Sequence, residues 1–102
     1  MAPFATDVVF SSPGISMLTG DPAKTTIEGH AALRTYIEDA LRRTSQVRYS
    51  LQATYVGIDT IIIVYTCGLP DGSQKWGSDL MRVDGDGKVV EWRCHYEERG
   101  TV

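Results

Sequence analysis

The chain has 102 residues, of which 42% are hydrophobic and 23% are charged, and its formal net charge is −3. This composition is typical of a single globular domain, here residues 1–102, and it lacks the basic surface that nucleic-acid binding requires. No run approaches the roughly 18 apolar residues of a membrane span and no secretory signal opens the chain, so we expect a cytoplasmic protein that binds neither nucleic acid nor membrane.

The first half of the chain is predicted to contain one short strand, one loop and one helix. Residues 7–11 alternate as a strand does, and Pro13-Gly14 ends that strand. Residues 14–25 are expected to form a loop. Residues 29–43 carry apolar side chains at spacings of three and four, which predicts an amphipathic helix with a stripe of Ala32, Leu33, Tyr36, Ile37, Ala40 and Leu41.

The second half is predicted to form four antiparallel strands in a meander. Residues 47–58 alternate, and the β-branched run at 60–67 is typical of a central strand covered on both faces. Residues 74–97 read as two strands joined by the turn Asp84-Gly85-Asp86-Gly87, since Asp-Gly supplies the positive φ of a hairpin. In the last strand alternation separates an inward set from an outward set: Val90, Trp92, Cys94 and Tyr96 against Glu91, Arg93, His95 and Glu97. The simplest packing is an α+β fold in which a strongly curved antiparallel sheet wraps around one main helix.

The two cysteines, Cys67 and Cys94, lie in predicted strands. We expect two free, buried thiols, as in a cytosolic protein, and a disulfide is the alternative. Neither cysteine has a second ligand at a spacing typical of zinc sites, and the chain has no phosphate-binding loop or GxGxxG motif. No metal and no cofactor are therefore expected.

Three stretches resemble the nuclear transport factor 2-like superfamily in its SnoaL-like branch. Residues 4–10 followed by Pro13 resemble the family's first strand, and Ile27-x-Gly29-x-x-Ala32-Leu33-x-x-Tyr36 is similar to its helix entry. The segment DGKVVEWR at residues 86–93, followed by Tyr96-Glu97, resembles its closing strand. The resemblance covers residues 4–97 and implies a cone, in which a curved antiparallel sheet encloses a pocket against helices, commonly in a homodimer.

The same resemblance implies a shortened N-terminus. Family members usually begin with one or two further helices that close the wide end of the cone, whereas this chain starts almost at its first strand. A partner subunit, a ligand or residues 14–25 would then cover the apolar surface that helix and sheet expose. We expect a homo-oligomer, with a dimer as the first expectation and the outer face of the sheet as the contact.

Asp79 is the candidate acid of the interior. It shares the parity of Met81 and Val83, so it is predicted to point into the concave side beside the inward set of the last strand. A desolvated carboxyl against an apolar wall has a raised pKa, which suits an acid or base catalyst. The alternative is that Asp79 pairs with a core hydroxyl or backbone amide and holds the sheet together.

Two enzyme branches of the superfamily match only in part. The segment at residues 79–84 is similar to the ketosteroid isomerase branch, in which the matching acid stabilises an enolate while protonated. However, Ser12 stands where that branch has its general-base aspartate, and its tyrosine donor on the N-terminal helix has no counterpart. Residues 92–96 resemble the epoxide hydrolase branch, but Cys94 stands in the place of its catalytic acid.

The expected function is therefore binding of a small apolar molecule in a concave pocket of a homo-oligomer. The expected pocket residues are Ser12, Tyr36, Trp92, Cys94 and Tyr96, with Asp79 as the candidate catalytic group, and both histidines, His30 and His95, are expected at the surface. One alternative is an isomerase, cyclase or hydrolase that uses Asp79 as acid or base. The other is an assembly or interaction module.

Overall fold

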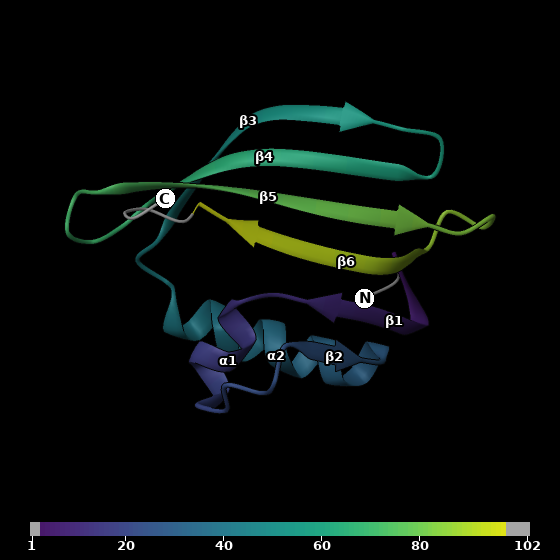
Figure 1. The fold of residues 1–102 in the computed structure, drawn as a ribbon, viewed down its shortest axis with the longest axis horizontal. Coiled ribbons are helices and arrows are strands. Elements are labelled where there is room, and N and C mark those ends of the chain that lie inside the picture. The colour runs from purple at the N-terminus through teal and green to yellow at the C-terminus, as the bar shows by residue number, and fades with distance from the viewer. Residues whose placement is uncertain (1–2, 98–102) are drawn as a thin grey trace.

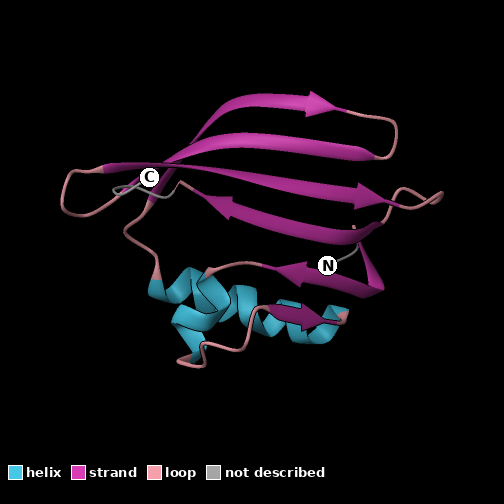
Figure 2. Ribbon diagram, viewed as in Figure 1, coloured by secondary structure: helices cyan, strands magenta, loops and turns pink. Residues whose placement is uncertain are grey.

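The computed structural model describes residues 3–97, and its elements follow one another along the chain in an α+β order (Figure 1). They are β1 (Phe4–Ser11), α1 (Gly14–Thr19), β2 (Thr26–Glu28), α2 (His30–Arg43), β3 (Arg48–Val56), β4 (Thr60–Gly68), β5 (Gln74–Val83) and β6 (Val89–Tyr96). Figure 2 shows both helices on one side of the curved sheet, at the end formed by β1 and β2. The predicted curved sheet around one main helix is confirmed.

The strands of the described chain form one six-stranded sheet in the order β2-β1-β6-β5-β4-β3. The meander from β3 to β6 is antiparallel, as predicted, because short hairpin turns connect its strands. The sheet as a whole is mixed, since β1 pairs with β6 in parallel. These two strands come from opposite ends of the chain, so no hairpin constrains their relative direction.

Residues 14–25 differ from the predicted loop. They contain the short helix α1, which buries Ile15 and ends at Gly20 in a left-handed conformation with φ 75°. Glycine adopts this conformation without the steric cost that other residues meet, so it is a common helix terminator. A helix of six residues is too short to show a periodic pattern, which is why the sequence did not predict it.

The core lies where α2 packs on β1 and β2. Val8, Phe10 and Leu33 are buried there, and the Phe10 ring packs against Trp92 at a centroid distance of 4.6 Å. Val89, not Val90, joins this core, because a bulge near Val83 shifts the register of β5 and β6. The prediction that Val90 shares the inward face was therefore wrong.

The half of the sheet formed by β3 and β4 is less covered than the sequence predicted. In β4 only Tyr65, Thr66 and Cys67 are buried, so the prediction of cover on both faces was wrong for the rest of the strand. The physical reason is that α2 packs on β1 and β2, at the opposite end of the sheet. The exposed apolar side chains of β3 are Tyr49, Leu51, Tyr55 and Val56, and Leu41 of α2 is exposed as well.

The remaining expectations concern the thiols and the surface. Cys67 and Cys94 are both free, as predicted. His95 is exposed, with its ring Nδ1 3.2 Å from the Ser78 carbonyl oxygen. In the part of the chain that the structure describes, no helix has the length and apolar character needed to cross a membrane.

Candidate functional site

Asp79 lies on the concave face of the sheet and is only 6% exposed, which confirms its predicted inward orientation. The register of the sheet pairs it with Ile63 on β4 and with Cys94 on β6. The Tyr65 hydroxyl donates a hydrogen bond to its Oδ1 at 2.8 Å, and the Trp92 indole N–H donates one to its Oδ2 at 3.0 Å. Each oxygen of the buried carboxyl group therefore has its own donor.

Tyr65 is the site residue that the sequence analysis missed. It sits opposite Gly77 on β5, and its ring lies over that glycine. A Cβ atom at Gly77 would stand 2.8 Å from Cε2 of the Tyr65 ring, so only glycine leaves room for the ring to reach Asp79. Residues two apart on a strand share a face, so alternation places Tyr65 with Ile63, but only the register of β4 against β5 places Ile63 opposite Asp79.

Cys94 and Ser12 extend the polar cluster away from Asp79. Asp79 and Ser12 both lie near enough to the Cys94 thiol to affect its pKa, and the Ser12 Oγ accepts the backbone N–H of Gly14 at 3.1 Å. Burial, followed by the charge of Asp79, raises the pKa of Cys94 well above its ordinary value of 9.0. The thiol therefore stays protonated at neutral pH and is a poor nucleophile.

Two tyrosines lie on either side of Ser12. Tyr96, at the end of β6, lies near enough to Ser12 for that side chain to lower its pKa slightly, but burial is the main effect and raises the pKa of Tyr96 to about 12. Tyr36 comes from α2 and packs on the Phe10 ring at a centroid distance of 5.5 Å. A Cβ atom at Gly14 would stand 3.5 Å from the Tyr36 hydroxyl oxygen and 3.4 Å from Ser12 Oγ, so both hydroxyl groups meet at this glycine.

The structure thus gathers all the predicted site residues around Cys94 and adds Tyr65. Two hollows border this cluster. The larger, of about 610 Å³, lies between α1, the β4–β5 connection and the end of β6, and it is lined by Pro13, Gly14, Met17, Leu69, Ser73, Gln74, Lys75, Tyr96 and Glu97. The smaller, of about 440 Å³, is lined by Ser11, Ser12, Pro13, Ser16, Thr25 and Cys94.

The hollows take in only some of the expected pocket residues. Ser12, Cys94 and Tyr96 line them, whereas Tyr36 and Trp92 line neither. Asp79 lines neither hollow. Its carboxyl group lies deeper, where Tyr65 and Trp92 donate hydrogen bonds to it. A molecule in either hollow would meet Ser12, Cys94 or Tyr96 before it met Asp79.

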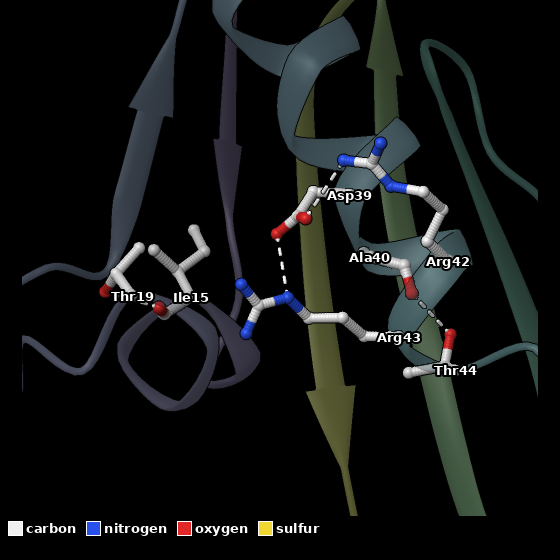
Figure 3. A network of polar contacts seen from close by, with 7 residues as sticks. All are labelled: Ile15, Thr19, Asp39, Ala40, Arg42, Arg43 and Thr44. Atoms are coloured by element: carbon white, nitrogen blue, oxygen red, sulfur yellow. Dashed lines mark hydrogen bonds and ion pairs between the residues drawn. The ribbon is translucent and has the colours of Figure 1, made fainter.

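Polar contacts fix the ends of the two helices beside the site (Figure 3). In α1 the Thr19 hydroxyl donates to the Ile15 carbonyl oxygen at 2.7 Å. At the end of α2, Asp39 pairs with Arg42 at 3.2 Å and with Arg43 at 3.0 Å. These exposed pairs add little stability, and the single Asp39 carboxylate offsets one of the two positive charges in the last turn of α2.

The raised pKa values predict a loss of stability at alkaline pH. The ordinary pKa values are 10.0 for Tyr96 and 9.0 for Cys94, and both are raised in the folded state. The unfolded chain therefore releases these protons first, so the stability is fully present below about pH 9 and falls as the pH rises toward the folded values. Urea unfolding at pH 7, 9 and 11 measures this. Tyr96→Phe should fall less steeply, and an unchanged urea midpoint up to pH 11 would contradict the prediction.

The fold and the site together define a small α+β cone with a buried polar cluster beside open hollows. Residues 1–97 match the model of the SnoaL-like domain, and the chain belongs to that family, within the nuclear transport factor 2-like superfamily. The search of curated proteins found no match.

Solved structures agree with this assignment. A SnoaL-like protein of unknown function from Burkholderia thailandensis has 25% identity and a TM-score of 0.78, with 95% of this chain and 77% of that chain covered. A nuclear transport factor 2-like protein of unknown function from Mesorhizobium loti has 24% identity and a TM-score of 0.72, with 95% and 74% covered. A steroid delta-isomerase from Pseudomonas aeruginosa has 16% identity and a TM-score of 0.72, with 95% and 64% covered, and this similarity concerns the fold alone.

Proposed function

We propose that the protein binds a small, largely apolar molecule in the hollows beside Ser12 and Tyr96. The observation that carries this proposal is the polar cluster of Ser12, Cys94 and Tyr96, which borders two concave spaces, the larger of which has Met17 and Leu69 in its wall. Small-molecule sites commonly combine an apolar wall with a few convergent polar groups. The SnoaL-like family assignment is consistent with this function.

The geometry favours binding over acid–base catalysis by Asp79. A general acid or base needs to come within hydrogen-bond reach of the reacting group. Asp79 is nearly inaccessible, and both of its oxygens accept hydrogen bonds from Tyr65 and Trp92. In our proposal Asp79 holds the cluster in place and does not touch the ligand. If the protein were instead an isomerase, cyclase or hydrolase, it would convert the bound molecule to a product.

The binding test uses naphthalene-2-methanol as a neutral apolar probe, followed by NMR chemical shifts of the protein. We expect the largest shifts at Ser12, Cys94 and Tyr96. Tyr96→Ala should weaken binding by about tenfold, which corresponds to losing one aromatic contact of about 1.4 kcal/mol. The control is Ile58→Ala, because Ile58 is a fully exposed apolar residue that lines neither hollow. Equal binding by all three proteins would contradict the proposal.

We also propose that two copies associate through the outer face of the sheet. Ile62 on β4 pairs with Tyr55 on β3 and with Leu80 on β5, and these side chains alternate with the inward set, so they form an apolar patch on the convex side. A contiguous exposed apolar patch commonly marks an interaction surface. Three charged residues lie beside this patch: Arg82, Glu91 and Arg93. Glu91 forms an ion pair of 3.3 Å with each of the two arginines.

Sedimentation velocity tests this association. We expect a dimer for the unmodified protein and a monomer for Ile62→Glu, since a carboxylate in the contact would be desolvated without a partner. Leu41→Glu is the control, because Leu41 is an exposed apolar residue on α2 and lies outside the patch. A monomer at high concentration without any substitution would refute the dimer and leave the binding proposal standing.

The proposed location is the cytoplasm. Cys67 and Cys94 are free thiols, and reduced cysteines are the rule in that compartment. Fractionation of cells that express the tagged full chain tests this location, and recovery of the protein from an extracytoplasmic fraction would contradict it.

A further inference from the structure

We propose that the larger hollow selects an apolar molecule that carries a single carboxylate group, which Lys75 and Tyr96 bind. This inference rests on the proposed function and specifies its ligand class. The hollow is suited to such a molecule in size, since about 610 Å³ lies within the range of small-molecule sites. The ammonium group of Lys75 and the phenol of Tyr96 suit the carboxylate of the ligand, and the apolar wall of the hollow suits the rest of the molecule.

Lys75 supplies the charge. It has the parity of Gly77 and Asp79 on β5, so its side chain starts from the concave face, and it is paired with Cys67 in the register. Lys75 lines the larger hollow, and its positive charge opposes the rise that burial causes in the pKa of Cys67. Among the described residues, no ion pair joins Lys75 to a carboxylate, so its charge is available to a ligand.

The arginines of α2 differ from Lys75 because each of them pairs with a carboxylate. Arg42 and Arg43 share Asp39 at the end of α2 (Figure 3), and Arg34 pairs with Glu38 at 3.0 Å. None of these arginines lines either hollow. The lysine is therefore the cationic group of the larger hollow.

Tyr96 supplies a second donor. Tyr96 lines the same hollow as Lys75, and its phenol can donate a hydrogen bond. An ammonium and a phenol on one hollow are complementary to an anionic oxygen, and hydrogen bonds to a charged acceptor are stronger than those between neutral groups.

The other polar groups restrict the ligand to one negative charge. The Ser73 hydroxyl already donates to Asp71 at 2.6 Å. Glu97 also lines the hollow, and its Oε1 accepts the backbone N–H of Trp76 at 3.0 Å. Among the described residues, Lys75 is the single cationic residue in this lining, so a second anionic group on the ligand would have no cation to pair with. Met17, Leu69 and Pro13 form the apolar wall for the rest of the molecule.

The test compares three probes with the same ring system and different head groups: 2-naphthoate, naphthalene-2-methanol and 2-naphthylmethylamine. Calorimetry at low salt should show 2-naphthoate binding about fivefold more tightly than the alcohol, as expected for one exposed ion pair of about 1 kcal/mol. The amine should bind most weakly. Added salt should reduce the preference for 2-naphthoate, because an exposed charge pair is screened.

Lys75→Gln isolates the head-group contact. This variant should bind 2-naphthoate and the alcohol equally, while its affinity for the alcohol stays unchanged. Lys24→Gln is the matched control, because Lys24 is exposed and does not line the hollow, and it should retain the preference. Thermal unfolding of both variants checks that each is folded.

The outcomes separate the two proposals. If the alcohol binds as tightly as 2-naphthoate, or if Lys75→Gln retains the preference, the carboxylate inference is overturned and the proposed binding function stands. If none of the three probes binds to the unmodified protein, both are overturned.

Discussion

Asp79→Ala is expected to lower the free energy of unfolding by roughly 2–5 kcal/mol, because it leaves two buried donors without an acceptor. The Tyr65 hydroxyl and the Trp92 indole N–H both donate to this carboxyl group, from 2.8 and 3.0 Å. No water replaces the acceptor easily, since the position is only 6% exposed. Urea unfolding at pH 7 measures the loss.

Two further variants make this test specific. Asp79→Asn keeps one acceptor oxygen but presents an amide N–H to the other donor, so it should lose less than the alanine variant. Asp7→Ala is the control, because Asp7 is an exposed aspartate on β1, and its change should stay within about 0.5 kcal/mol. Equal stability of Asp79→Ala and Asp7→Ala would show that the hydrogen bonds of Asp79 do not hold the sheet.

Gly77→Ala is expected to cost about 1–3 kcal/mol, because the added methyl group overlaps the Tyr65 ring. The new Cβ would stand 2.8 Å from Cε2 and 2.9 Å from Cζ of that ring. The ring has to move, and its hydroxyl then loses the hydrogen bond to Asp79. Urea unfolding measures the effect, and the near-ultraviolet circular dichroism of the tyrosine should change with it.

Gly85→Ala provides the matched control for Gly77→Ala. Gly85 lies in the β5–β6 turn, nothing stands within 4 Å of its added Cβ, and its change should be within about 0.5 kcal/mol. In a double-mutant cycle, Tyr65→Ala should remove most of the cost of Gly77→Ala, since the ring that clashes is then absent. Additive costs would refute the proposed contact between Gly77 and the Tyr65 ring.

The inward orientation of the site residues was predictable because strand alternation is a local rule. Asp79, Trp92 and Cys94 were placed on one face from parity, and the hydrogen bonds and register of the structure agree. Parity failed at Val90, where a bulge breaks the alternation. A bulge depends on pairing with another strand, so the alternation of β6 alone does not reveal it.

The partner of Asp79 was not predictable in the same way. Tyr65 lies 14 residues before Asp79, in a run whose other members are mostly β-branched. Its role requires the register of β4 against β5, which places the ring over Gly77 and next to the carboxyl group. Neither the composition of the run nor its periodicity contains that register.

The sequence by itself determined the α+β class, the main helix, the meander and the family resemblance, because periodicity, turn chemistry and motif order are written in neighbouring residues. Only the tertiary structure decided that β1 joins β6 in parallel, that Tyr65 and Trp92 enclose Asp79, and that Lys75 and Tyr96 line one hollow. Each of these depends on contacts between residues far apart in the chain, whose relative positions the packing of strands and helices sets.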